Sequence, residues 1–322
     1  MQTLARRIAI GVALALGAVP LAALAQYPNK PIRLVLQFPA GGVADAAARI
    51  VAQPLSQALG QPVIVENRPG ADGAIAGEAV MKAVPDGYTL LFATNSTLSA
   101  VPTLRKNPPY HPVTDFTPIS MVGRFSFFVF THPGVPAKTL AELVNYARAN
   151  PGKLNYGTGN TTSILATAQF KSLAGIDMVQ VPYKGDAPAA TDLLGGRVDL
   201  VIGSTVPGLA LAKEGKLRAL ATLLARRSSH LPDVPTMAEA GFPEYAVSSW
   251  AAIFGPAKLP RPVVERLTRE INAILQRPEI REQLERQAFE VGGSTPEDLG
   301  TFVKEQLEVW RRAVREAGIP QE

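Results

Sequence analysis

The sequence contains no cysteine and only three histidines among its 322 residues. Without cysteine the protein has no disulfide bond, thiolate metal site or cysteine nucleophile, and it suits an oxidising compartment in which a stray thiol would be a hazard. The histidines, His111, His132 and His230, lie far apart along the chain. No zinc-protease, serine-hydrolase or phosphate-loop motif occurs. These absences argue against an enzyme, a metal site or a cofactor, although scattered residues could still meet in space.

Long apolar runs are also absent after the N-terminal segment, so no later stretch approaches the roughly 20 apolar residues of a membrane span. The N-terminal segment places Arg6 and Arg7 before an apolar run from Ile8 to Leu21, and Ala23-Leu24-Ala25 follows. This pattern is typical of a secretory signal peptide with a small-residue cleavage site. A membrane anchor is the alternative, but glycines and a proline within the run weaken it. We expect residues 1–25 to be removed, with cleavage after Ala25, and the mature protein to be periplasmic.

The net charge is low. It is +5 for the whole chain, and losing the two arginines of the N-terminal segment takes it to +3. A charge of this size does not suggest a nucleic-acid partner. The remaining 297 of the 322 residues are enough for two domains of about 150 residues each.

Two blocks of alternating strands and helices organise the mature chain, over residues 31–124 and 125–246. Repeated βα units imply a mostly parallel sheet, so the blocks predict two comparable α/β lobes. The rest of the chain is mainly helical, and the apolar face of one helix contains Val264, Leu267, Ile271, Ile274 and Leu275. We expect these helices to return to the first lobe. The predicted lobes are therefore 26–124 plus 247–322, and 125–246.

A proline and two glycines separate the first predicted strand from the first predicted helix. The strand covers Ile32 to Phe38, and the alanine-rich helix ends at Leu59. The loop between them carries Gly41 and Gly42. The first backbone N–H groups of a helix have no partner within it, and the helix dipole adds positive charge there. The loop is therefore a candidate anion site, and the two glycines would let an anion come close.

Polar residues follow two other predicted strands. The segment TNST (94–97) includes Asn95 and Ser96, and the segment TGNTTS (158–163) leads into a second-lobe helix. Their hydroxyl and amide groups are candidate donors to the same ligand. Helix capping, or an ordinary polar loop, is the alternative for each of them.

Several motifs, in this order, resemble the Bug/TctC family of periplasmic solute-binding proteins of tripartite tricarboxylate transporters. They include FPAGGVADAAAR, NYGTGNTTS, VPYKGDAPAATDLLGGRVDL, PDVPTMAEAG and WAAIFGPAKLP. The resemblance covers essentially the whole mature chain. It implies an α/β, type II periplasmic-binding-protein-like fold, with two βα lobes, an interlobe ligand cleft and C-terminal helices that return to the first lobe.

The resemblance also implies that a ligand carboxylate is held between a first-lobe loop and a second-lobe loop, each of which leads into a helix. By position these loops are residues 39–45 and 157–163. The residues that we expect to contact the ligand are Pro39, Ala40, Gly41, Gly42, Asp45, Asn95, Ser96, Gly157, Thr158, Thr161, Thr162, Ser163, Tyr183 and Gly185.

Two of the charged residues in these motifs need separate consideration. Asp45 would repel a bound carboxylate, so it either stabilises the helix start or contacts the ligand through water or at an amino group. Lys184, between Tyr183 and Gly185, is more typical of a solvated surface charge.

The chain departs from the family pattern in two places. The loop after Tyr156 is shorter than in many relatives, and Ile164 stands where they often carry a histidine. The stretch 201–221 also has a less polar ending, so Ser204 and Thr205 are weak candidates. The contacts to the far end of the ligand are therefore not implied by the resemblance.

The expected function is that of an exported binding protein that captures a small organic carboxylate for a tripartite tricarboxylate-type transporter. A ligand-binding sensor subunit that docks on a membrane signalling partner is the first alternative, since its cleft would be the same, and an enzyme acting on a carboxylate is the second. We expect a monomer. Dicarboxylates, tricarboxylates, acidic amino acids and aromatic acids all remain possible ligands, because backbone N–H groups recognise the carboxylate and little else.

Overall fold

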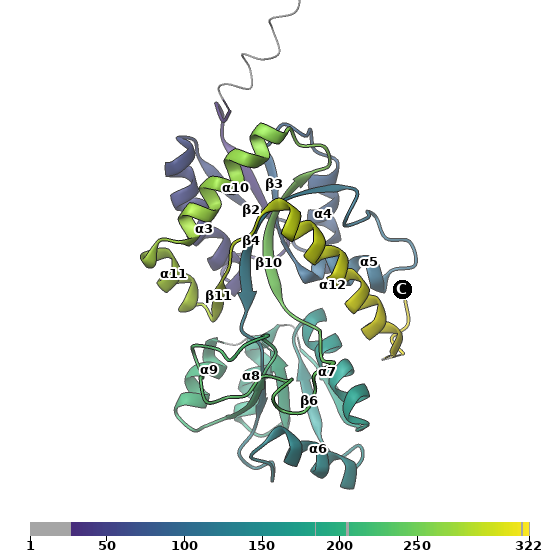
Figure 1. The fold of residues 1–322 in the computed structure, drawn as a ribbon. Helices are drawn as coiled ribbons and strands as arrows, with labels where there is room; N and C mark the ends of the chain where they lie inside the picture. The colour runs from purple at the N-terminus through teal and green to yellow at the C-terminus, as the bar shows by residue number, and fades with distance from the viewer. Residues whose placement is uncertain (1–26, 184, 204–205, 317, 322) are drawn as a thin grey trace, which may run out of the picture.

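The computed structural model describes residues 27–183, 185–203, 206–316 and 318–321 and arranges them in two α/β lobes (Figure 1). The predicted signal peptide and Lys184, Ser204 and Thr205 lie outside the described residues. Within the described part, no helix is both long and apolar enough to cross a membrane. The prediction of two α/β lobes is confirmed.

The first lobe is built on a six-stranded sheet in the order β11-β4-β10-β3-β1-β2. The first three strands along the chain are parallel, and β10, β4 and β11 add antiparallel pairs. The strands are β1 (Ile32–Leu36), β2 (Val63–Asn67), β3 (Thr89–Thr94), β4 (Phe116–Phe125), β10 (Trp250–Pro256) and β11 (Phe289–Val291).

Helices cover both faces of this sheet (Figure 1). Because side chains alternate along a strand, Leu34 and Leu36 join one apolar cluster while Val35 joins another. The helices are α3 (Val43–Leu59), α4 (Ala74–Met81), α5 (Val101–Leu104), α10 (Arg261–Leu275), α11 (Pro278–Glu285) and α12 (Pro296–Glu316). Leu267 and Ile271 of α10 are fully buried with the first cluster, and Leu299 and Val303 of α12 belong to the second. The C-terminal helices therefore return to the first lobe, as predicted.

The second lobe repeats this design with a five-stranded sheet in the order β7-β6-β8-β5-β9. Its strands are β5 (Phe128–Thr131), β6 (Asn155–Thr158), β7 (Val179–Pro182), β8 (Leu200–Gly203) and β9 (Arg218–Thr222). Its helices are α6 (Leu140–Ala149), α7 (Thr161–Ala174), α8 (Asp186–Leu194) and α9 (Val206–Lys213). All five strands lie within the range predicted for the second lobe, and the strands of the first sheet lie outside it except for the last residue of β4.

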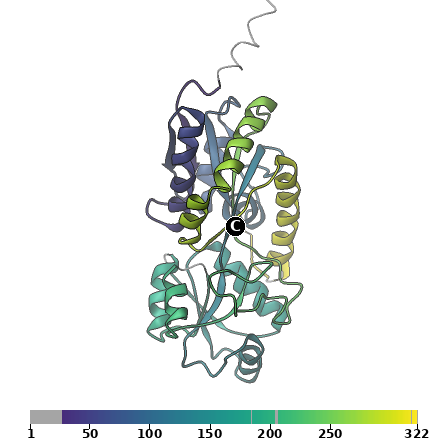
Figure 2. The same cartoon turned by 60° about the vertical axis from the view of Figure 1, so that its left-hand side comes forward.

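The two lobes are stacked end to end, and β4 and β10 run toward the junction between them (Figures 1 and 2). The chain passes directly from β4 to β5 through residues 126–127. The edge strand β11 adds a second link, because the Glu290 carboxylate accepts hydrogen bonds from the Ser228 hydroxyl at 3.1 Å and the Ser229 N–H at 3.4 Å. The pairing of β11 with β4 therefore carries an interlobe contact.

Gly123 of β4 should be irreplaceable, because a Cβ at that position would lie 2.2 Å from the backbone carbonyl oxygen of Glu290. We expect Gly123→Ala to lower the free energy of unfolding by about 1–3 kcal/mol through overpacking. Gly300→Ala is the control. Gly300 lies within α12, and a Cβ there would meet only the Pro118 side chain, at an ordinary contact distance of 3.6 Å. That variant should be about 0.5–1 kcal/mol more stable because alanine favours a helix. Urea unfolding compares them, and equal stability would contradict the packing argument.

Candidate ligand-binding cleft

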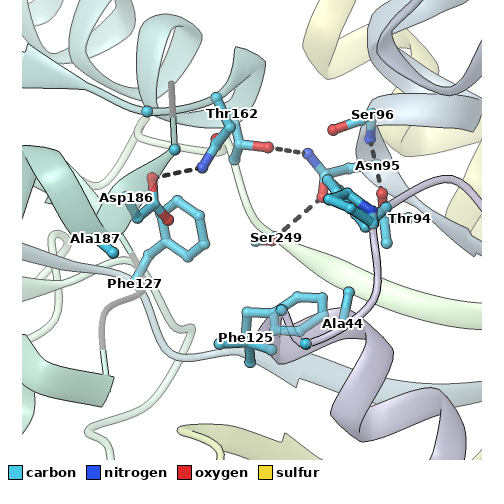
Figure 3. Close-up of a pocket in the computed structure, with 18 of the residues that line it drawn as sticks. Ala44, Thr94, Asn95, Ser96, Phe125, Phe127, Thr162, Asp186, Ala187 and Ser249 are labelled. Atoms are coloured by element: carbon cyan, nitrogen blue, oxygen red, sulfur yellow. Dashed lines mark hydrogen bonds between the residues drawn. The ribbon is translucent and has the colours of Figure 1, made fainter. Parts of the chain in front are cut away.

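A cleft of about 550 Å³ lies between the lobes, where loops from both sheets lead into helices (Figure 3). Both lobes contribute to its wall, as do Phe127 of the segment between β4 and β5 and Ser249 directly before β10. It is lined by Phe38, Pro39, Gly41, Gly42, Val43, Ala44, Thr94, Asn95, Ser96, Phe125, Phe127, Gly159, Asn160, Thr162, Gly185, Asp186, Ala187, Pro188 and Ser249.

The start of α3 presents free backbone donors to this cleft. Gly42 is the N-cap residue, and no side chain caps the helix. Among the described residues, no group accepts a hydrogen bond from the N–H of Gly42, Val43 or Ala44. The helix dipole adds positive potential at the same place. Uncapped donors of this kind hold anions in many proteins, so the first-lobe side of the cleft suits a carboxylate.

Asp45 holds this loop in place from behind the cleft wall. The carboxylate is buried and accepts hydrogen bonds from the Gly41 N–H at 3.0 Å, Arg49 Nε at 2.9 Å and Asn67 Nδ2 at 2.8 Å. Burial opposes ionisation of Asp45, but the three hydrogen bonds outweigh it and lower the pKa from its ordinary value of 3.8 to about 2. Asp45 therefore stays ionised and serves the loop and the helix start, and it does not line the cleft.

Asn95 connects the two lobes at the end of β3. Its side chain is buried, donates to Thr162 Oγ1 at 2.6 Å and accepts from Ser249 Oγ at 3.2 Å (Figure 3). Thr162 belongs to the second lobe and Ser249 directly precedes β10. A short π-helical segment, Ser96–Ala100, follows Asn95. Such segments are frequent at functional sites.

The second-lobe loop before α7 uses its polar groups mainly for the helix itself. The Asn160 side chain accepts from the Ser163 N–H at 2.9 Å, and Ser163 Oγ accepts from the Gly159 N–H at 3.1 Å and the Asn160 N–H at 3.2 Å. This is a capping box, which satisfies the first donors of α7. The helix-capping alternative is therefore realised by Asn160 and Ser163, while Thr162 faces the cleft.

The start of α8 forms the remaining second-lobe wall. Asp186 accepts a hydrogen bond from Asn160 Nδ2 at 2.8 Å, which ties this wall to the loop before α7. The two loops touch so closely that a Cβ on Gly159 would lie 2.3 Å from the carbonyl carbon of Gly185. Among the lining residues that the structure describes, Asp186 is the only one with an ionisable side chain.

The end of β4 and the segment that follows it each supply one aromatic ring. Phe125 and Phe127 are both buried and both line the cleft. The Phe125 ring packs edge-on against Phe289 with 4.9 Å between ring centroids. Figure 3 shows both rings apart from the hydrogen-bonded group of Asn95, Thr162 and Ser249. The cleft therefore has polar and aromatic walls.

Half of the predicted contact residues line the cleft and half do not. Those that line it are Pro39, Gly41, Gly42, Asn95, Ser96, Thr162 and Gly185. Those that do not are Ala40, Asp45, Gly157, Thr158, Thr161, Ser163 and Tyr183.

Three of the residues outside the wall have other partners. Thr158 Oγ1 accepts from Gln180 Nε2 at 2.9 Å, and the Tyr183 hydroxyl donates to Asp192 at 2.8 Å. Thr161 donates to Asp72 of the first lobe at 3.0 Å, so it joins the lobes beside the cleft.

Sequence reasoning missed several lining residues. Asp186, Ala187 and Pro188 directly follow Gly185, so the same motif could have indicated them. Phe125 and Phe127 gave no such signal, because they looked like strand residues of a buried core. In the described part of the chain, no cluster of three or more histidine, aspartate or glutamate residues could hold a metal ion.

Comparison with known proteins identifies relatives along nearly the whole chain. A family model described as "Tripartite tricarboxylate transporter family receptor" matches residues 47–319. Protein BugT of Bordetella pertussis is 37% identical over 295 residues, which cover 91% of this chain and 90% of that protein.

Two solved structures of similar proteins contain carboxylate ligands. Rpa4515 of R. palustris with adipate is 34% identical with a TM-score of 0.80, covering 91% of this chain and 99% of that one. MatC (Rpa3494) of Rhodopseudomonas palustris with bound malate is 29% identical with a TM-score of 0.77, covering 89% of this chain and 100% of that one.

Replacing Asp45 should change the acid stability of the protein. Its folded pKa lies below its unfolded value, so the ionised group stabilises the fold above about pH 4, and this contribution is lost as the pH falls from about 4 to 2. We expect Asp45→Asn to lower the free energy of unfolding at pH 7 by about 2 kcal/mol and to flatten its decline over that range.

The control for this prediction is Asp233→Asn, which removes an exposed carboxylate. Its stability at pH 7 should match that of the parent within about 0.5 kcal/mol, as expected for an exposed substitution. Denaturant unfolding between pH 2 and pH 7 measures both variants. An Asp45→Asn curve that runs parallel to the parent would show that the Asp45 hydrogen bonds do not hold the loop.

Proposed function

Because the chain belongs to the tripartite tricarboxylate transporter receptor family of periplasmic solute-binding proteins, we propose that its interlobe cleft captures a small organic carboxylate for delivery to the membrane subunits of a transporter. Relatives with bound adipate and malate support a carboxylate as the ligand class. The protein acts as a monomer on this proposal, with a first lobe of residues 26–124 plus 247–322 and a second lobe of residues 125–246.

The uncapped start of α3 is the observation that carries this proposal. The N–H groups of Gly42, Val43 and Ala44 are the donors that a carboxylate would use, and the helix dipole favours its charge. Gly41 has a different role, because its N–H already donates to Asp45. Its φ of +88° explains why a glycine stands there.

Capture involves both lobes on this proposal. A ligand at the start of α3 also meets Thr162 and the start of α8, which belong to the second lobe. Contacts with both lobes stabilise the arrangement in which the lobes are close together. The hydrogen bonds Asn95–Thr162 and Asp72–Thr161 also join the two lobes when they are close together.

The cleft lining also favours binding without chemical conversion. Among the described lining residues there is no histidine, lysine or arginine, and the Asp186 carboxylate accepts from Asn160. No pair of a nucleophile and a base therefore faces the ligand from these residues. We propose that the carboxylate is released unchanged.

Gly42→Val tests the carboxylate site. The backbone at Gly42, with φ −81° and ψ 168°, accepts a branched residue, and its Cβ would meet only the Pro39 carbonyl oxygen at 3.9 Å. The added side chain would instead obstruct the cleft beside the N–H donors. Losing two charge-assisted hydrogen bonds of about 1.5–3 kcal/mol each predicts at least a roughly hundredfold weaker affinity. Calorimetry measures this with the acid selected by a thermal-shift screen of adipate, malate and 3-phenylpropanoate.

The matched control is Gly195→Val at the end of α8, where φ is −78° and the nearest atom to a Cβ is 3.6 Å away. This variant should bind as the parent does. Gly42→Val should lose no more than about 1 kcal/mol of stability, since valine is a poorer N-cap than glycine. A Gly42→Val protein that unfolds early yet binds at full strength would defeat the proposed anion site.

Export is the second part of the proposed function. We propose that residues 1–25 form a signal peptide that is cleaved after Ala25, so that the mature chain begins at Gln26. Mass spectrometry of the protein from the periplasm should give the mass of residues 26–322. A mass that still includes residues 1–25 would contradict this prediction.

A further inference from the structure

The cleft offers a carboxylate donors at the start of α3, but both of its lining amide side chains are already paired within the protein. Asn95 donates to Thr162 and accepts from Ser249. Asn160 accepts from the Ser163 N–H and donates to Asp186. A second carboxylate on the ligand would therefore compete with protein–protein hydrogen bonds for each of these amides.

The charge of the cleft also disfavours a second carboxylate. Asp186 is the only ionisable side chain among the described lining residues, and its carboxylate would repel another anion. A ligand group near α8 is next to Ala187 and Pro188, whose side chains offer no hydrogen-bond donor. No side chain caps the start of α8, but the Asp186 carboxylate in its first turn already complements the positive end of the helix dipole, so a second anion gains less there.

The aromatic side chains suit a flat apolar group instead. Phe125 and Phe127 lie on either side of the single residue Ser126 in the segment that links the lobes, and both are buried. The contact with Phe289 holds the Phe125 ring in a fixed orientation. Phe38 of the first lobe adds a third, half-buried ring. Rings of this kind gain from stacked or edge-on contact with another aromatic group, beyond the burial of apolar area.

We infer that the preferred ligand is an aromatic monocarboxylate, an inference that rests on the proposed function. Its carboxylate lies at the start of α3, and its ring lies against Phe125 and Phe127. This assignment separates the chain from its relatives with bound adipate and malate, which are both dicarboxylates.

Four compounds of similar size test the ligand class by calorimetry. They are 3-phenylpropanoate, hexanoate, adipate and 3-phenylpropanamide. Hexanoate and adipate differ in the second carboxylate, hexanoate and 3-phenylpropanoate differ in the ring, and the amide lacks the negative charge. We expect 3-phenylpropanoate to bind at least about tenfold tighter than adipate, hexanoate to bind between them, and the amide to bind at least about tenfold more weakly than its acid.

The results separate failure of this inference from failure of the proposed function. If adipate binds more tightly than hexanoate, the ligand class is a dicarboxylate and only this inference is overturned. If hexanoate matches 3-phenylpropanoate, the aromatic part of the inference is overturned. If no acid binds, malate included, or if the amide binds as tightly as its acid, the proposed carboxylate site fails, and this inference fails with it.

Phe127→Leu tests the role of the ring without emptying the wall. The variant should bind 3-phenylpropanoate about 3- to 10-fold more weakly and should bind hexanoate within about twofold of the parent. Phe128→Leu is the matched control, because Phe128 is fully buried in the second lobe and does not line the cleft. It should change neither affinity. Equal losses for both acids in Phe127→Leu would overturn ring recognition, and thermal unfolding verifies that both variants are folded.

Discussion

A protein can hold an anion with backbone N–H groups only if no group of its own already accepts from them, and the first lobe meets this constraint at the start of α3. A serine, threonine or aspartate at the N-cap would satisfy these donors with its side chain. Gly42 leaves them free. The uncapped helix start loses some stability, and Asp45 offsets this loss from within the helix by accepting from Gly41, Arg49 and Asn67. The loop is thus held firmly although its donors face the cleft.

In the second lobe, the first backbone N–H groups of α7 are satisfied by side chains of the protein itself. The start of α7 is closed by the capping box of Asn160 and Ser163, so its role is to present Thr162 to Asn95 and Thr161 to Asp72. The start of α3 therefore provides free donors, whereas the start of α7 provides contacts that bring the second lobe against the first. Asn95 donates to Thr162 and also accepts from Ser249, so it connects α7 with the residue directly before β10. Movement of the lobes must break or shift this hydrogen-bonded group.

The sequence predicted local structure well, because strands and helices follow from apolar spacing and turn residues within a few positions. The strand at β1, the loop with Gly41 and Gly42 and the helix α3 are of this kind. The role of Asp45 was left open, since it depends on Asn67, which is 22 residues away at the end of β2. Phe125 and Phe127 were missed because their exposure to a cleft depends on the pairing of β4 with β10, whose residues are distant in sequence and whose register is irregular. Local patterns contain no information on such pairings.

The main-chain donors at the start of α3 and the side chains of the remaining wall can determine different parts of the specificity. The proposed anion site uses the main chain of one helix start, supported by Asp45 from outside the cleft wall, whereas much of the remaining wall consists of side chains, including Phe127, Ala187 and Pro188. A change at Phe127, Ala187 or Pro188 alters what lies beyond the carboxylate without disturbing Gly42 or the hydrogen bonds of Asp45. Recognition of the charge and recognition of the rest of the ligand are therefore physically separate. One fold of this type can serve different carboxylates because only the second of these two functions depends on the identity of the side chains in the wall.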